Sequence, residues 1–170
     1  FSGTIASNIL YGNPDGSEAE MKEAAEIAQA TEFIEEKQKK YESPIAQGGS
    51  NVSGGQKQRL SIARAIAKKP KVYIFDDSFS ALDYKTDVTL RAALKEKTQD
   101  STVIIVAQRI STILHAEQII VLDDGKIVGI GTHKELLKSC EAYYQIASSQ
   151  LSETELARDL NNETDGKEEA

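Results

Sequence analysis

Four residues in the first half of the chain are suited to binding an anion: Ser53, Gly54, Gly55 and Gln56. Adjacent glycines expose backbone N–H groups and let an anion approach closely, while the serine and glutamine can add hydroxyl and amide contacts. An apolar pattern of roughly helical period follows and ends before Pro70. We therefore expect a helix from Ser53 to about Lys68, whose dipole attracts phosphate. By itself such a run is also typical of an ordinary loop and helix cap.

Three polar residues follow two apolar segments that we interpret as strands. Asp76 and Asp77 directly follow the apolar segment 72–75, and Gln108 follows the segment 102–107, which has the composition of a buried strand. Ligands of parallel α/β sheets bind beyond the carboxyl ends of the strands. Asp76, Asp77 and Gln108 all occupy such ends.

The remaining pattern alternates strands and helices, which predicts an α/β architecture with a mostly parallel sheet. We expect further helices near 4–11, 17–30, after 31, 83–98 and 110–115, with Asp83 as a cap, and a loop over 43–51. The segments 118–122 and 126–130 flank Asp123-Asp124-Gly125 and predict a hairpin. Capping boxes are expected at 17–20 and 132–135.

Composition excludes several classes of protein. The net charge of −7 and the pI of about 5.0 argue against a nucleic-acid partner. A single cysteine, Cys140, excludes an internal disulfide, and no segment approaches the ~20 apolar residues of a membrane span. His133 and His115 lack metal-like spacing, and a surface or capping role is expected for His133. The acidic segment 152–170 is expected to be disordered.

Taken in order, three motifs resemble those of the ATP-binding cassette (ABC) family. The run 52–65 resembles its signature motif, 72–77 its Walker B strand, and the residues Ser80, Ala81 and Asp83 belong to a segment similar to its D-loop. The resemblance covers residues 1–151, and features at both ends are similar to exporter-type members. It implies a helical signature subdomain at about 4–69, followed by a region from Walker B to the C-terminal subdomain at about 70–151.

The resemblance implies a partial P-loop NTPase-like domain with a mostly parallel sheet and a helical signature subdomain. The family's phosphate-binding loop (Walker A) would precede residue 1, so this piece alone would be inactive. In the full-length chain, an upstream transmembrane domain and a second nucleotide-binding subunit are implied partners, at the cytoplasmic face of the membrane. ATP and Mg²⁺ are the implied cofactors, with Asp76 beside the metal. The nucleotide-binding residues would be Ser53, Gly54, Gly55, Gln56, Ser80, Ala81 and Asp83.

Two residues depart from the family pattern at what would be one γ-phosphate. Asp77 stands where the family has a catalytic Glu, and Gln108 stands where it has His. The signature motif is intact apart from Val52. This combination resembles the impaired half of a heterodimeric exporter, whose own site is slow or silent while its signature motif completes the partner's site.

Other interpretations remain open from the sequence. Each substitution could be tolerated drift in a working site. The chain could belong to a soluble cassette ATPase that works on ribosomes or DNA, for which the upstream sequence would be decisive. It could also be a non-hydrolytic nucleotide-binding module that regulates its partner, for which binding without hydrolysis would be decisive.

Overall fold

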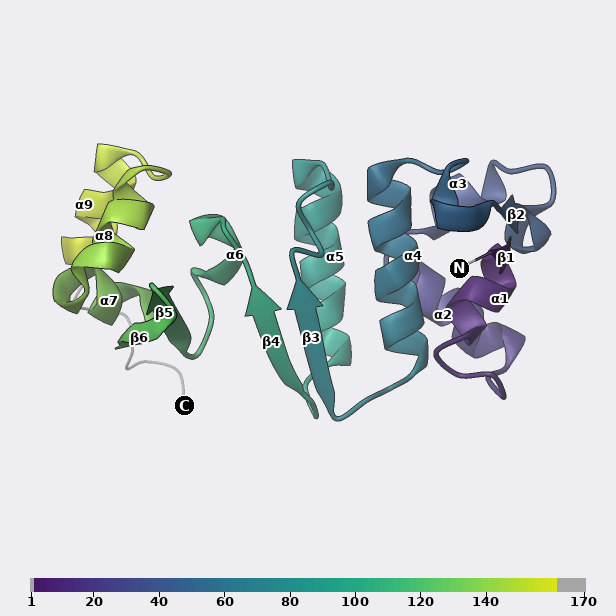
Figure 1. The fold of residues 1–170 in the computed structure, drawn as a ribbon, viewed down its shortest axis with the longest axis horizontal. Coiled ribbons are helices and arrows are strands. Elements are labelled where there is room, and N and C mark those ends of the chain that lie inside the picture. Colours follow the sequence, from purple (N-terminus) through teal and green to yellow (C-terminus); the bar gives the residue numbers. More distant parts are fainter. Residues whose placement is uncertain (1, 162–170) are drawn as a thin grey trace. The chain divides into compact units, whose positions relative to one another are not determined.

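The computed structural model describes residues 2–161, which fall into two compact units divided between Val106 and Ala107 (Figure 1). Each unit has its own cluster of buried apolar side chains. The described strands form three two-stranded sheets, and only the β3–β4 pair is parallel. The expected parallel pairing is therefore present, but as a single pair within this part of the domain.

The first unit is mostly helical. Its elements are β1 (Gly3–Thr4), α1 (Ile5–Leu10), α2 (Glu18–Ile27), α3 (Thr31–Glu35), η1 (Lys40–Glu42), β2 (Pro44–Ile45), η2 (Gln47–Gly49), α4 (Gly54–Ala67), β3 (Val72–Asp76), α5 (Tyr84–Lys97) and β4 (Thr102–Val106). The expected helices are confirmed, within a few residues at their ends. The expected loop 43–51 contains short regular pieces, β2 and η2.

Helix α4 buries one face in the core of this unit. Leu60, Ile62, Ala63, Ile66 and Ala67 are buried, because they fall on the helix face that packs against α1 and α2. The expected capping box at 17–20 is confirmed at the start of α2.

A long-range polar contact fixes α4 to α1. The guanidinium of Arg64 donates from Nε to the Asn8 carbonyl oxygen at 2.8 Å and from Nη2 to Asn8 Oδ1 at 3.0 Å. Asn8 is itself buried, and its Nδ2 donates to the Thr4 carbonyl oxygen at 2.9 Å. Burying an amide that is hydrogen-bonded in this way costs little free energy of folding, whereas burying the same amide without partners would destabilise the fold.

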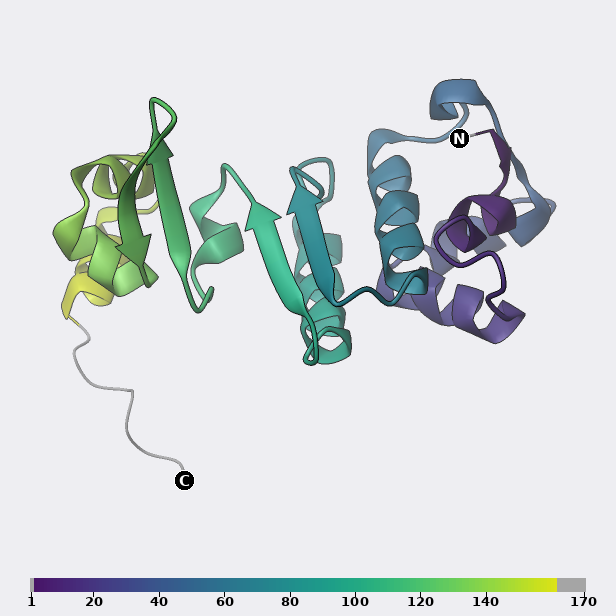
Figure 2. The same cartoon turned by 60° about the horizontal axis from the view of Figure 1, so that its bottom comes forward.

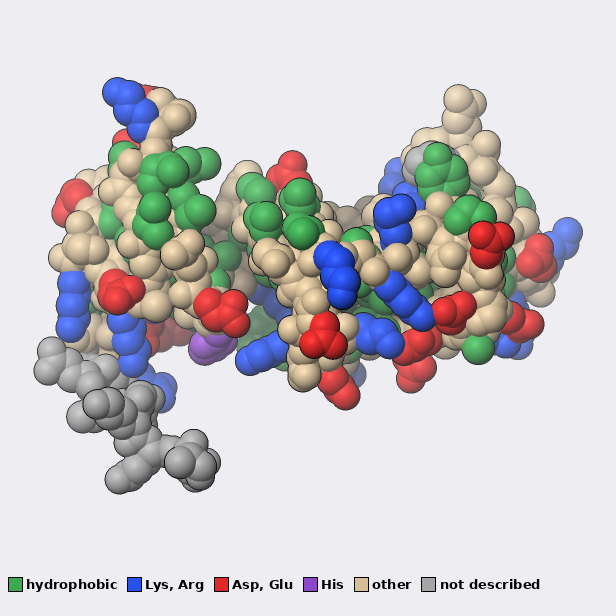
Figure 3. Space-filling view, turned by 90° about the horizontal axis from the view of Figure 1, so that it is seen from below, with side chains coloured by type: hydrophobic (Ala, Val, Ile, Leu, Met, Phe, Trp, Pro, Cys, Tyr) green, Lys and Arg blue, Asp and Glu red, His purple; other side chains and the backbone are tan. Residues whose placement is uncertain are grey.

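The β3–β4 pair has one covered and one open face. Tyr73 and Phe75 are buried, while Val72 and Ile74 are exposed, because side chains alternate along a strand. Helix α5 lies along one face of the pair (Figures 1 and 2). Strand β4 is exposed at four of its five positions, so the expectation of a buried strand is wrong for the described chain. Hydrophobic side chains over this pair are visible from below (Figure 3).

The second unit combines a hairpin with helices. Its elements are α6 (Ile110–Ile113), β5 (Ile119–Asp123), β6 (Lys126–Gly131), α7 (His133–Ser139), α8 (Glu141–Ser148) and α9 (Glu153–Asn161). The predicted hairpin is confirmed, with Asp123 opposite Lys126. Asp124 and Gly125 both have positive φ, at 45° and 72°, as a two-residue turn of the I′ type requires. The capping box of Thr132 and Glu135 is also confirmed.

Two expectations for this unit do not hold. The acidic segment from 152 was expected to be disordered, yet Glu153–Asn161 forms α9, with Leu156 buried in the core of the unit. Residues 162–170, the rest of that segment, lie outside the described residues. His133 is buried rather than on the surface.

The ring of His133 joins α7 to two other helices. Its Nδ1 lies 2.8 Å from the Tyr143 hydroxyl and its Nε2 lies 3.2 Å from Asp159 Oδ2. An ionised Asp159 can only accept, so Nε2 carries a proton, and in the neutral ring Nδ1 then accepts from the Tyr143 hydroxyl. Apolar burial of α9 is thus combined with a directional polar contact.

In the part of the chain described, no helix combines the length and apolarity that crossing a bilayer requires.

Replacing Arg64 should weaken the packing of α4 on α1. Arg64→Ala leaves two acceptor oxygens of Asn8 without their donor, and a buried group left unsatisfied costs about 1–3 kcal/mol. We expect a lower Tm in thermal unfolding of the full-length protein. Lys68→Ala, at the exposed end of the same helix, should leave Tm nearly unchanged. Equal Tm values for the two variants would contradict a stabilising role of the Arg64 contact.

The buried Tyr143 phenol should make the stability of the folded protein depend on pH in the alkaline range. Burial, with a smaller contribution from Asp159, raises the pKa of Tyr143 to about 12. An unfolded chain releases this proton near pH ~10, so the stability that the neutral phenol contributes is complete below that pH and is lost toward pH ~12. Between pH ~9 and ~11, we expect Tm to fall less steeply in Tyr143→Phe than in wild type. Tyr144→Phe, which alters the neighbouring and more exposed ring, should follow wild type.

Candidate functional site

The first turn of α4 presents hydrogen-bond donors. Ser53 is the N-cap: its Oγ accepts from the Gln56 N–H at 3.2 Å, and Gln56 Oε1 accepts from the Ser53 N–H at 3.1 Å. This reciprocal pair uses acceptor atoms of both side chains. The Ser53 hydroxyl proton and the Gln56 Nε2 protons remain able to donate. The N–H groups of Gly54 and Gly55 have no acceptor within the helix, so the turn is suited to an anion.

Asp76 and Asp77 lie at the carboxyl end of β3, as expected. Both are exposed in the described chain. The Asp77 N–H donates to the Val106 carbonyl oxygen at 3.2 Å, which continues the pairing with β4 by one residue. The Ser78 hydroxyl donates to the Asp76 carbonyl oxygen at 3.3 Å. Two adjacent carboxylates therefore project where the strand gives way to a turn.

The backbone of Asp77 has a special conformation. Its φ is +47°, in the left-handed region where Asp and Asn are enriched over longer side chains. The Ser80 hydroxyl lies 3.1 Å from Asp77 Oδ2 and 3.2 Å from the Asp77 carbonyl oxygen. A short carboxylate at this position can thus bond to its own turn, which gives Asp77 a structural role besides any chemical one.

The turn after β3 packs against the first turn of α4. A Cβ placed on Gly54 would lie 3.6 Å from Ala81 Cβ, which is ordinary contact. A Cβ placed on Gly55 would lie 2.9 Å from the Ala81 carbonyl oxygen, which is closer than backbone atoms tolerate. The structure thereby brings together Ser53, Gly54, Gly55, Gln56, Asp76, Asp77, Ser80 and Ala81 within one unit.

One residue in this region was missed by the sequence reasoning. Gln58 extends from α4 to the turn after β3, where its Nε2 donates to the Asp77 carbonyl oxygen and to Ser80 Oγ, each at 3.1 Å. Its Oε1 accepts from the Ala81 N–H at 2.9 Å. Only the polarity of a side chain on the helix could have indicated this role, because the partners lie 19 to 23 residues away.

Asp83 caps α5 as expected. Its Oδ1 accepts from the Thr86 N–H at 3.0 Å and its Oδ2 from the Thr86 hydroxyl at 2.7 Å. These hydrogen bonds, that of the backbone N–H first, lower the pKa of Asp83, and the charge of Arg59 acts in the same direction. The carboxylate therefore stays ionised, and it closes the turn that starts at Asp77.

Gln108 belongs to the second unit. Its carbonyl oxygen accepts from Gln150 Nε2 at 2.8 Å, and Gln150 Oε1 accepts from the Ile110 N–H at 2.9 Å. Gln150 thus holds the backbone on both sides of Arg109. The side chain of Gln108 is exposed at the start of this segment.

The residues present are compatible with a magnesium ion held jointly with phosphate. Among the described residues, no group of three or more His, Cys, Asp or Glu is arranged around a metal position. Mg²⁺ in phosphate sites usually takes one or two carboxylates plus phosphate oxygens and water. The exposed carboxylate of Asp76, a hard oxygen ligand at a strand end, fits that requirement.

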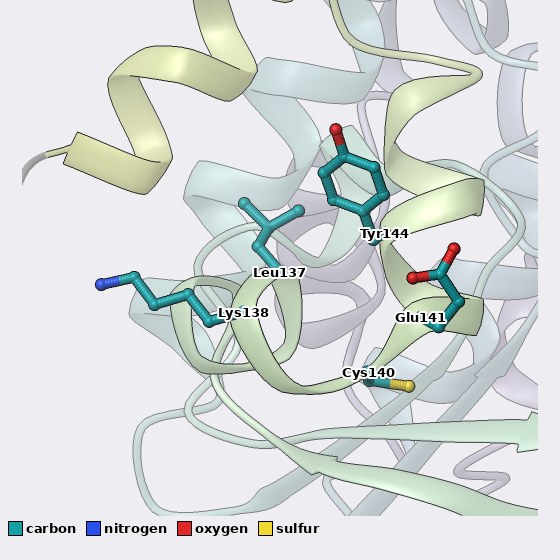
Figure 4. A pocket seen from close by; sticks show the side chains of 5 residues that line it. All are labelled: Leu137, Lys138, Cys140, Glu141 and Tyr144. Carbon is teal, nitrogen blue, oxygen red and sulfur yellow. The ribbon is translucent and has the colours of Figure 1, made fainter.

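A surface hollow between α7 and α8 has a different character. Leu137, Lys138, Cys140, Glu141 and Tyr144 line it (Figure 4). The Cys140 thiol is buried and lies 3.8 Å from the Val128 carbonyl oxygen. A Cβ on Gly129 would meet Cys140 Sγ at 2.9 Å, so the cysteine serves to pack α7 and α8 on β6.

Comparisons with known proteins agree with the geometry of the first unit. The ABC transporter family profile matches residues 3–80. An uncharacterized ABC transporter ATP-binding protein of Mycobacterium tuberculosis is 50% identical over 88% of this chain, and an ATP-dependent lipid A-core flippase of Photobacterium profundum is 44% identical over 90%. Each alignment covers 26% of the relative, so the chain spans about a quarter of the length of these relatives.

A solved structure gives the same result. A bacterial Atm1-family ABC exporter with ATP bound matches 90% of this chain and 27% of its own, with a TM-score of 0.86 and 35% sequence identity. Its similarity extends the match beyond residue 80 to most of the chain. The order of a donor-rich helix start, a strand ending in carboxylates and a capped turn, together with these matches, identifies the chain as part of a nucleotide-binding domain of the ABC transporter family.

Proposed function

We propose that the chain is part of the ATP-binding subunit of an ABC exporter, in which binding and hydrolysis of ATP drive transport. The observation that carries this is the first turn of α4, where backbone and side-chain donors converge without an acceptor. In the full-length protein, transmembrane helices would precede this part and place it at the cytoplasmic face of the membrane. The flippase of Photobacterium profundum and a putative multidrug export ATP-binding/permease protein of Staphylococcus aureus, 43% identical over 88% of this chain, support the exporter class.

The chain would contribute to two nucleotide sites through different residues. Ser53, Gly54, Gly55 and Gln56 would donate to the phosphates of an ATP held mainly by a second nucleotide-binding subunit, with Ser80, Ala81 and Asp83 beside them. Asp76 and Asp77 would face the ATP held by this chain's own phosphate-binding loop. A magnesium ion bound at Asp76 would neutralise phosphate charge there.

This chain's own site would hydrolyse ATP slowly. Asp77 is one methylene shorter than the usual Glu, and a misplacement of about 1 Å can cost about a hundredfold in rate. Its carboxylate also lies within hydrogen-bond distance of Ser80, which competes with a water molecule for the same oxygen. Gln108, at the position of the usual His, cannot carry a positive charge. The partner subunit would then be non-identical and would hold the working ATP.

The Gly54 position offers a direct test of this arrangement. In Gly54→Glu, a carboxylate would occupy the anion position and repel phosphate. We therefore expect ATP turnover by the full-length transporter with its natural partner to fall to a few per cent or less. This loss is at least as large as that from removing one oxyanion donor. Glu is well tolerated in the first turn of a helix, so folding should persist. Ser61→Glu adds the same charge at an exposed position of α4 and is the control. Turnover near the wild-type level in Gly54→Glu would disprove the assignment of the working site.

Restoring the usual residues should activate the slow site. In the Gly54→Glu background, where the partner's site is blocked, Asp77→Glu combined with Gln108→His should raise the residual turnover by about tenfold or more, within the ~10²–10⁴ range of general-base assistance. The gain should be less than the full range, because Glu is less favourable than Asp at the left-handed backbone of residue 77. Residual turnover that does not rise would contradict a site limited by these two residues.

A further inference from the structure

We propose that Gln58 is a positioning residue that holds the turn after β3, at one half-site of this chain, in register with the start of α4, at the other half-site. The inference rests on the proposed function for what the half-sites bind, but its geometry is independent of it. No other described side chain makes hydrogen bonds from α4 to both Asp77 and Ala81.

The orientation of the Gln58 amide is dictated by its partners. The Ala81 N–H can only donate, so the atom 2.9 Å away must be the oxygen Oε1. The Asp77 carbonyl can only accept, so the atom 3.1 Å away must be Nε2. A rotated amide would place donor against donor and acceptor against acceptor. The side chain therefore has one favourable arrangement, and that arrangement requires the turn to keep its present conformation.

Ser80 joins this contact to the Asp77 carboxylate. Its Oγ accepts from Gln58 Nε2 at 3.1 Å, which leaves its proton to be donated to Asp77 Oδ2 or to the Asp77 carbonyl oxygen. Gln58 thus acts on the carboxylate through Ser80 and on the peptide of Asp77 directly. Connected hydrogen bonds of this kind reinforce one another.

The close approach of Gly55 to Ala81 is a second, independent contact between the same elements. A Cβ at residue 55 would lie 2.9 Å from the Ala81 carbonyl oxygen, so the two backbones are already in van der Waals contact. Gln58 lies one helical turn further along α4 and bonds to the preceding peptide group of the turn, through the Ala81 N–H. The turn is therefore held both by its shape and by directional bonds, and only the bonds can be removed without creating a clash.

The test combines hydrogen exchange with kinetics on the full-length transporter and its natural partner. Gln58→Leu has similar volume but neither donor nor acceptor, so we expect faster amide exchange in a peptide that includes Ala81. The turn is in register with the donors at the start of α4, which would serve the partner's ATP, so we expect kcat for ATP to fall by about 10- to 100-fold, while KM changes by less than about threefold. Gln38→Glu, an exposed amide elsewhere in the same unit, is a control for both measurements.

A second variant covers the case in which Gln58→Leu does not fold. Gln58→Glu keeps an acceptor for the Ala81 N–H, but when ionised it cannot donate to Asp77 or Ser80. Relative to wild type, we expect faster exchange at Ala81 and a lower kcat in Gln58→Glu. In Ser80→Ala, a further Gln58→Glu change should reduce kcat by a smaller factor than it does in wild type, because the two residues share one network.

The outcomes separate this inference from the proposed function. Unchanged exchange at Ala81 in Gln58→Leu would overturn the inference whatever the turnover. Accelerated exchange with unchanged turnover, in a complex that Gly54→Glu inactivates, would also overturn it, since the contact would then stabilise without positioning. If Gly54→Glu has no effect, the proposed function fails, and the inference is then decided by exchange at Ala81 alone.

Discussion

The contact between the first turn of α4 and the turn after β3 is the constraint on which the candidate site depends. At Gly55 the Ala81 carbonyl oxygen leaves no room for a side chain, and three residues on, Gln58 bonds to the peptides of Asp77 and Ala81. The glycine therefore has two separate reasons to be there. It exposes an N–H to an anion, and it lets a second backbone approach the helix start.

Charge is divided along this contact. The start of α4 offers hydrogen-bond donors. The capping pair occupies Ser53 Oγ and Gln56 Oε1 as acceptors, so the hydroxyl and amide protons of these side chains remain able to donate. The end of β3 offers the carboxylates of Asp76 and Asp77. Donors attract phosphate, whereas carboxylates attract a metal ion or orient water. Two surfaces of opposite electrostatic character on one short stretch are suited to different parts of a nucleotide, or to different nucleotides.

The conformation of Asp77 adds a structural reason for an aspartate at this position. A left-handed backbone and a nearby Ser80 hydroxyl both favour a short carboxylate. From the sequence, the shorter side chain has only two explanations, relaxed demand for hydrolysis or tolerated drift. In the structure, the Asp77 carboxylate also accepts from the Ser80 hydroxyl of its own turn, which is a structural role. An aspartate at position 77 can therefore be explained by the conformation of the turn, independently of any effect on the rate of hydrolysis.

The sequence by itself determined the features that depend on near neighbours. The capping boxes at 17–20 and 132–135 and the Asp124-Gly125 turn join residues three or fewer apart in the sequence, so their spacing determines their geometry. The order of the three motifs over residues 52–83 likewise indicated the ABC family from the sequence alone.

Only the tertiary structure decided the roles of Gln58, Arg64 and His133, the exposure of β4 and the helix at Glu153–Asn161. The hydrogen-bond partners of Gln58, Arg64 and His133 lie 10 to 56 residues away in the sequence. Which polar groups come into contact there follows from tertiary packing, which the local sequence pattern does not encode.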